Sequence, residues 1–147
     1  MNSRSKIQRI LVVEDNLDEA RLILRCLSET CLGRAEAYLV RDGVEAIEYV
    51  FEENQAAREV REMPSLILLD LKLPRVSGLE VLERLKGHPV TRRIPVIVMS
   101  SSLAIEDVNR SLDAGANSYV CKPVEFESLR AFVSSAVEYW TNWNVSS

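Results

Sequence analysis

Short apolar runs alternate along the chain with longer amphipathic segments. The runs occupy residues 10–13, 37–40, 66–69, 96–99 and 119–121. Most of them are rich in β-branched residues and show no polar residue at every second position. This composition is typical of parallel strands whose two faces are both covered by helices. The pattern therefore predicts five buried strands.

The segments between these runs carry apolar residues at helical spacing, three or four positions apart. The five apolar stripes consist of Ala20, Ile23, Leu24 and Leu27; Val44, Ile47, Val50 and Phe51; Leu79, Leu82 and Leu85; Ile105, Val108 and Leu112; and Phe126, Leu129, Val133, Ala136, Val137 and Trp140. Five strands that alternate with five helices predict a doubly wound α/β domain with a parallel sheet. Residues 52–63 are charged and form a long connection, which fits either an extended helix or a surface loop.

Length and composition narrow the class of protein. The chain has 147 residues, 47% hydrophobic and 27% charged, as expected of one globular domain. Its net charge of -4 disfavours nucleic-acid binding, which requires a basic face. The apolar runs are too short for a membrane span or a signal peptide. We therefore expect a cytoplasmic domain with reduced thiols at Cys26, Cys31 and Cys121, the last buried in its strand.

Polar side chains with complementary chemistry follow four of the predicted strands. Glu14 and Asp15 follow the first strand, Asp70 the third, Ser100 the fourth and Lys122 the fifth. Because ligands of open α/β sheets bind at the carboxyl ends of the strands, we expect these side chains to converge. Each residue alone is a common turn or surface residue. Their consistent placement at one edge of the sheet favours a functional site.

The predicted cluster has a defined chemistry. Converging carboxylates repel one another unless a cation lies among them, and Mg²⁺ suits carboxylate, phosphate and water oxygens. Asp70 beside such a cation is a candidate nucleophile that could attack a phosphoryl donor and form an acyl phosphate. The Lys122 ammonium could then neutralise one phosphoryl oxygen, and the Ser100 hydroxyl could hydrogen-bond another.

The motifs around these residues resemble those of receiver domains of two-component response regulators. The matching segments are Leu-Val-Val-Glu-Asp-Asn at 11–16, Leu-Leu-Asp-Leu-Lys-Leu-Pro at 68–74 with Ser77-Gly78, Pro-Val-Ile-Val-Met-Ser at 95–100, Ala-Gly-Ala at 114–116 and Tyr-Val-Cys-Lys-Pro at 119–123. The resemblance covers about residues 7–140 and implies a single receiver domain in 1–147. It also implies a flavodoxin-like fold with strand order 2-1-3-4-5. Each motif is common by itself, whereas the ordered set is specific.

The resemblance implies roles for the acidic residues. Asp70 would accept a phosphoryl group from the phosphohistidine of a sensor histidine kinase. Glu14, Asp15, Asp70 and the backbone carbonyl of Lys72 would hold Mg²⁺.

A conformational switch is implied as well. Ser100 would turn toward the phosphoryl group, Lys122 would contact it, and Tyr119 would change rotamer in response. The bond between Lys122 and Pro123 would be a cis peptide. Residues 100–102 are all serine, so the switch hydroxyl is ambiguous by one residue; Ser100 is favoured because the apolar strand ends just before it.

Lys72 departs from the commoner receiver pattern, which has Asn or another uncharged residue at this position. Its ammonium could shield an acyl phosphate from water or weaken metal binding, so the phosphoryl lifetime stays open. The alternative function is an aspartyl-phosphate phosphatase of the haloacid-dehalogenase type. That class needs a second Asp at this position as general acid, and Lys72 disfavours it.

The residues at the end of the chain bear on how the domain would pass on its signal. Seven residues follow Trp140, so we expect a stand-alone regulator that is not an enzyme and acts by protein–protein interaction or as a homodimer. The charged segment 52–63 and the aromatic end near Tyr139 and Trp140 resemble the small regulators of bacterial and cyanobacterial phytochrome kinases. The resemblance thus implies a phytochrome-type kinase as partner. The net charge and the short apolar runs predict no nucleic-acid or membrane partner.

Overall fold

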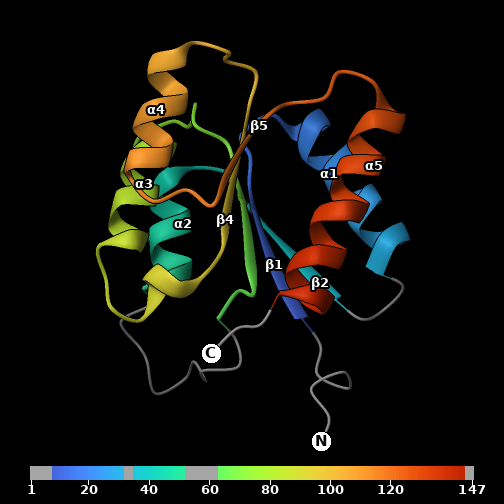
Figure 1. Ribbon diagram of the computed structural model, residues 1–147, viewed down its shortest axis with the longest axis horizontal. Helices are drawn as coiled ribbons and strands as arrows, with labels where there is room; N and C mark the ends of the chain where they lie inside the picture. The colour runs from blue at the N-terminus through green and yellow to red at the C-terminus, as the bar shows by residue number, and fades with distance from the viewer. Residues whose placement is uncertain (1–7, 32–34, 52–62, 145–147) are drawn as a thin grey trace, which may run out of the picture.

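The computed structural model describes residues 8–31, 35–51 and 63–144, in which strands and helices alternate (Figure 1). The strands are β1 (Gln8–Val13), β2 (Ala35–Val40), β3 (Leu66–Leu69), β4 (Val96–Ser100) and β5 (Ser118–Cys121). The α-helices are α1 (Leu17–Cys31), α2 (Gly43–Val50), α3 (Gly78–Lys86), α4 (Ile105–Asp113) and α5 (Phe126–Glu138). A short 3₁₀ helix, η3 (Thr91–Arg93), precedes β4, and a π-helical turn, η4 (Tyr139–Trp143), follows α5.

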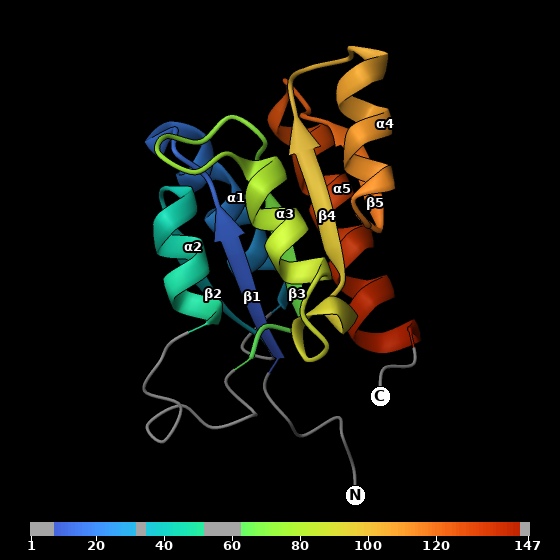
Figure 2. The same cartoon turned by 90° about the vertical axis from the view of Figure 1, so that its left-hand side faces the viewer.

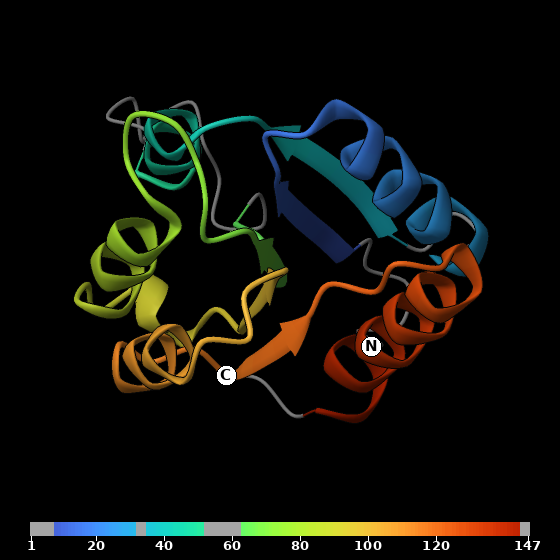
Figure 3. The same cartoon turned by 90° about the horizontal axis from the view of Figure 1, so that it is seen from above.

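The five strands form one parallel sheet in the order β2-β1-β3-β4-β5. Helices α1 and α5 lie side by side on one face of the sheet, and α2, α3 and α4 cover the other (Figure 3). The arrows of β1 and β4 point to the same end of the sheet (Figure 2). The predicted doubly wound sheet and its strand order are thus confirmed.

Two apolar cores flank the sheet, and alternate strand residues point into them. Ile10 and Val12 belong to the core under α1 and α5, whereas Leu11 and Val13 belong to the core under α2 and α3. All four residues are at most 1% exposed. Because both faces of the strand are covered, every position must be apolar, which is why β1 is a continuous apolar run.

Helix α4 departs from the predicted pattern. Ile105 and Leu112 of its apolar stripe are 67% and 45% exposed, and the buried residue of this helix is Ser111. The expectation that the stripe faces the core is therefore wrong for these two side chains. Helix α4 lies toward the β5 edge of the sheet, where the strand residues are themselves only half-buried and offer little apolar surface to cover.

The same edge position explains a second correction. Cys121 was expected to be buried, but it is exposed at the end of β5, an edge strand with β4 as its neighbour. Cys26 and Cys31 are buried on α1, and none of the three cysteines forms a disulfide.

The end of the last helix presents aromatic side chains to solvent. Trp140 packs against the core under α1 and α5, as its place in the apolar stripe predicts. Tyr139 and Trp143 of the π-helical turn are 51% and 71% exposed. The predicted extension or loop within 52–63 falls outside the described residues, except for Met63. Among the helices that the structure describes, none has the length and apolar character needed to cross a membrane.

Replacing Ser111 with Ala is expected to stabilise the domain. The Ser111 hydroxyl is fully buried and has no hydrogen-bond partner, so folding strips it of water without replacing the lost bond. We expect the free energy of unfolding in urea to rise by about 1 kcal/mol. Ser135→Ala, at an exposed position of α5, is the matched control for the higher helix propensity of Ala. Equal gains in the two variants would contradict the prediction.

Candidate functional site

The carboxyl ends of the strands bring the predicted side chains together. Backbone hydrogen bonds continue the sheet one residue past the strands, from Glu14 N to Val40 O at 3.1 Å and from Asp70 N to Val13 O at 3.0 Å. A third bond of this kind runs from Lys122 N to Ser100 O at 2.8 Å. Parallel strands therefore fix the backbones of these residues at a common edge. A hollow of about 150 Å³ lies there, lined by Glu14, Asp15, Asn16, Glu19, Asp70, Lys72, Ser101 and Lys122.

The Lys122 ammonium stands at the centre of the acidic side chains. Its Nζ donates to Glu19 Oε1 at 2.5 Å, to Glu14 Oε1 at 2.9 Å and to Asp70 Oδ2 at 3.4 Å. An ammonium has three donors, and here carboxylates accept from all of them. Glu14 and Asp70 are buried, whereas the Glu19 side chain is 42% exposed. The arrangement neutralises buried acids that would otherwise repel one another.

Burial and pairing act in opposite directions on these groups. Burial alone would lower the pKa of Lys122, but hydrogen bonds to Glu19 and Glu14 and the charge of Asp70 outweigh it and raise this pKa. Lys122 is therefore a cation at neutral pH. Burial raises the pKa of Glu14, and the hydrogen bonds from Lys122 and from Asn16 N oppose that shift.

Close packing of α3 fixes the position of Asp70. Gly78 begins α3 directly against this residue: a Cβ at Gly78 would lie 2.1 Å from the Asp70 carbonyl oxygen. The Gly78 N–H also donates to Leu71 O at 2.9 Å. A capping box between Ser77 and Glu80 starts the helix at this point. The nucleophile candidate thus sits on backbone held by a helix start.

The loop between β3 and α3 is also tied to α2. Arg75 adopts a positive φ of 68°, and its Nη2 donates to Asp42 Oδ2 at 2.8 Å. Asp42 caps α2 by accepting from Glu45 N at 2.8 Å, and these two contacts lower its pKa. One carboxylate therefore joins the helix start to the loop that carries Lys72.

Ser100 and Ser102 link β4 to α4 and to Tyr119. Ser100 is fully buried, and its Oγ accepts from Ser102 N at 3.1 Å. The Tyr119 hydroxyl donates to Ser102 O at 2.8 Å, and Ser102 Oγ donates to Asp107 Oδ2 at 2.5 Å. Tyr119 is thus turned inward. Ser101 lines the hollow, so the one-residue ambiguity about the switch hydroxyl stays open.

The expected cis peptide bond before Pro123 is wrong. The described part of the chain contains no cis peptide bond. The trans form is the intrinsically preferred one for X–Pro bonds. In that form Lys122 already donates its backbone N–H to Ser100 and its ammonium to the carboxylates.

Sequence reasoning missed Glu19. This residue lies in the first turn of α1, four positions after Asp15, and its N–H donates to Asn16 Oδ1 at 3.0 Å. That cap places the first helical turn over the hollow. The available signal was an acidic residue one helical turn after the Glu14-Asp15 pair, which is also a common composition for any helix start.

The oxygen donors at this edge fit a hard divalent cation. Asp15 is exposed beside the hollow, Asp70 lines it, and Lys72 follows Asp70 by two residues with its N–H donating to Asp70 Oδ1 at 3.4 Å. No three Asp, Glu, His or Cys side chains of the described residues form a ready-made metal cage. Lys122 occupies the space between Glu14 and Asp70. One or two carboxylates with water are, however, the ligands that Mg²⁺ takes in proteins, so the donor set is compatible.

Comparison with known proteins assigns this chain to one family. The model of the response regulator receiver domain matches residues 10–134. This chain belongs to the receiver domain family. The lysine, the hydroxyl and the acidic residues of this receiver domain lie within the matched range.

Several relatives are similar over nearly their full length. The probable methanogenesis regulatory protein FilR2 of Methanothrix harundinacea is 40% identical over 93% of this chain and 86% of its own. Response regulator Rcp1 of Synechocystis is 35% identical over 89% and 87%, and its Mn²⁺-bound crystal structure has a TM-score of 0.83 to this domain. The crystal structure of the phosphorylated cyanobacterial phytochrome response regulator RcpA has a TM-score of 0.87 and 36% identity, over 95% of this chain and 98% of that one.

Replacing Gly78 with Ala is expected to destabilise the receiver domain. The new Cβ would overlap the Asp70 carbonyl, so α3 or the end of β3 must shift. We expect a loss of about 2 kcal/mol in the free energy of unfolding, measured in urea. Gly87→Ala is the control, because its Cβ would approach Glu83 O only to 3.1 Å. A loss at Gly87 as large as at Gly78 would count against the proposed overlap.

Proposed function

We propose that this receiver domain takes a phosphoryl group onto Asp70 from the phosphohistidine of a sensor histidine kinase. The observation that carries the proposal is the Asp70 carboxylate in an open hollow, with the Lys122 ammonium 3.4 Å from Oδ2. A carboxylate is a competent nucleophile toward phosphorus, and the ammonium can neutralise charge on the transferred group. The family membership and the phosphorylated form of RcpA support the assignment.

The transfer step balances without an external acid or oxidant. An Asp70 carboxylate oxygen forms a bond to phosphorus while the bond from phosphorus to the histidine nitrogen breaks. The kinase histidine keeps the electron pair, and Asp70 becomes a mixed anhydride of a carboxylic and a phosphoric acid. When Asp70 reacts, its negative charge passes to the phosphoryl group, whose oxygens become additional acceptors beside the Lys122 ammonium. Each chain takes up one phosphoryl group, which makes it a signalling protein and not a turnover enzyme.

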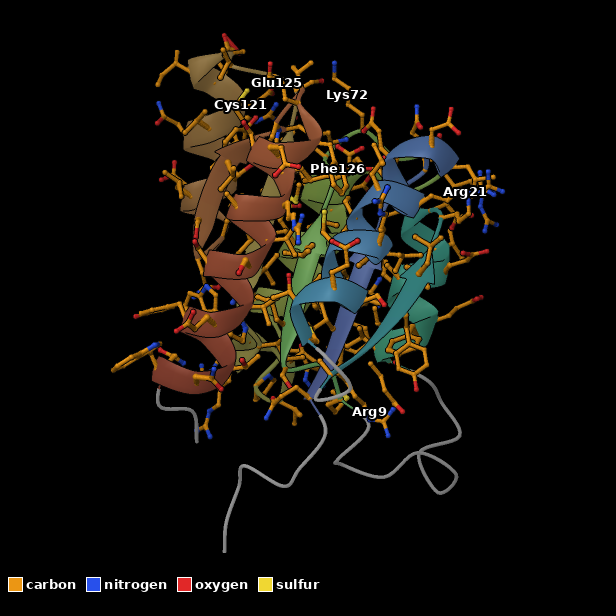
Figure 4. The ribbon with its side chains drawn as sticks, turned by 90° about the vertical axis from the view of Figure 1, so that its right-hand side faces the viewer. Arg9, Arg21, Lys72, Cys121, Glu125 and Phe126 are labelled. Carbon is orange, nitrogen blue, oxygen red and sulfur yellow. The ribbon has the colours of Figure 1, made fainter. Side chains whose placement is uncertain are left out.

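Asp15, Asp70, Glu14 and the Lys72 carbonyl are the groups that would hold Mg²⁺. When bound, the cation would neutralise charge on the phosphoryl oxygens during transfer. The Mn²⁺-bound form of Rcp1 supports a divalent site in this family. Lys72 lines the same hollow and lies exposed at the site end of the sheet (Figure 4). Its ammonium would place a second positive charge beside the phosphoryl site.

The proposed output is a binding event of a stand-alone, cytoplasmic regulator. Ser100 and Tyr119 are the switch residues, since both connect to Ser102 at the start of the loop into α4. The exposed Tyr139 and Trp143 are candidates for a homodimer contact through the last helix. The near-full coverage of Rcp1 and RcpA supports a receiver that works alone, and the phytochrome link of RcpA supports a phytochrome-type kinase as partner.

The first experiment is intact-protein mass spectrometry after incubation with acetyl phosphate. We expect one phosphoryl adduct per chain that forms when Mg²⁺ is present and does not form when Mg²⁺ is withheld. Asp70→Asn keeps the size of the side chain and removes the nucleophile, so it should give no adduct. Asp18→Asn, an exposed acidic residue of α1, is the matched control and should label normally. An adduct that persists in Asp70→Asn would refute the assignment of Asp70.

Replacing Lys122 with Ala is expected to leave some phosphorylation of Asp70 but to abolish the change in oligomeric state that follows it. The ammonium joins Asp70 to the end of β5, so its loss removes the contact through which a phosphoryl group acts on the switch residues. We expect residual labelling with acetyl phosphate but no phosphorylation-dependent change in oligomeric state, measured by size-exclusion chromatography with light scattering. Lys86→Ala removes a lysine of similar burial that bonds loop carbonyls at the far end of the sheet, and controls for loss of stability. An unchanged response in Lys122→Ala would overturn the role of Lys122.

A further inference from the structure

The Lys122 ammonium has no free donor for a phosphoryl oxygen. Its three N–H groups are directed to Glu14, Glu19 and Asp70. A phosphoryl group on Asp70 adds oxygens that seek the same ammonium. For Lys122 to bond a phosphoryl oxygen, one of its present contacts must be given up.

The three carboxylates differ in how easily they can release the lysine. The Glu14 side chain is 3% exposed, and leaving a buried carboxylate unpaired is strongly unfavourable. Asp70 carries the phosphoryl group and stays beside Lys122. The Glu19 side chain is 42% exposed, so water can solvate its carboxylate once the contact is broken. Glu19 is therefore the partner that yields.

The contact that must break is also the shortest of the three. Nζ lies 2.5 Å from Glu19 Oε1, against 3.4 Å from Asp70 Oδ2. Glu19 is held in place because its backbone N–H is capped by Asn16, whose own N–H donates to Glu14. The resting site is thus arranged around a lysine drawn toward α1 and away from Asp70.

We propose that Glu19 is a positioning residue that holds Lys122 in the resting state and competes with the phosphoryl group for it. Its effect is to favour the unphosphorylated form. The inference rests on the proposed phosphorylation of Asp70, and it concerns a residue of α1 that takes no part in bond making. Removing the Glu19 carboxylate frees one donor of Lys122 and strengthens the binding of a phosphoryl group or its mimic.

The test measures the affinity for beryllofluoride, a phosphoryl mimic that binds an Asp carboxylate, by fluorine NMR at fixed Mg²⁺. Glu19→Gln and Glu19→Ala are compared with the unchanged protein, and urea unfolding confirms that both variants fold. We expect the dissociation constant to fall about fivefold, the size of one partly exposed ion pair. A residue with a purely structural role would leave affinity unchanged or weaken it, so a gain in affinity identifies competition.

Asp18→Asn is the matched control, because it removes the same charge from the preceding, exposed position of α1, whereas the ion pairs of Lys122 are with Glu14, Glu19 and Asp70. Equal gains in Asp18→Asn and the Glu19 variants would show a general charge effect and overturn the proposal. Unchanged or weaker binding in the Glu19 variants would also overturn it. A different outcome would contradict the proposed function itself: the wild-type protein would bind beryllofluoride no better than Asp70→Asn does.

Discussion

A single ammonium makes the acidic edge of the sheet compatible with a folded protein. Parallel strands end at one side, so the residues after β1 and β3 place the Glu14 and Asp70 carboxylates close together in a site that excludes most water. Such carboxylates repel one another unless a cation lies between them. The Lys122 ammonium fills that position at the end of β5 and bonds both. The geometry of the hollow follows from this contact, because α1 contributes Glu19 to the same ammonium.

The sequence predicts those parts of the molecule that depend on parallel topology. Continuous apolar runs indicate strands covered on both faces, and the residue that follows each run must then lie at the common edge. Glu14, Asp70 and Lys122 lie there because backbone hydrogen bonds extend the sheet through each of them. Their placement at the common edge follows from the backbone topology without any side-chain geometry, so it can be predicted from the amino-acid sequence.

Other features depend on side-chain rotamers and on the limits of the sheet. The pairing of Glu19 with Lys122 depends on how α1 is rotated about its axis relative to β5. The spacing of apolar residues along the sequence does not give that rotation. The exposure of Ile105 and Cys121 depends on where the sheet ends, whereas their sequence patterns are those of buried residues. The trans bond before Pro123 likewise could not be read from the residues that flank it.

Hydrogen bonds around Ser102 connect the candidate site to helix α4. The proposed phosphorylation of Asp70 would replace one carboxylate charge with a phosphoryl charge of about -2, so the site would gain negative charge and draw donors toward Asp70. Ser100 lies at this edge, and its Oγ holds Ser102 N, while Ser102 in turn holds both Tyr119 and Asp107 of α4. A shift of the Ser100 hydroxyl toward phosphate would break the first of these bonds and loosen the residue that makes the other two. Helix α4 buries little apolar surface that could resist the movement, since Ile105 and Leu112 are exposed and the Ser111 hydroxyl is unpaired. If Asp70 is phosphorylated as proposed, this weakly packed helix is the element that the change of charge would displace at the lowest cost in free energy.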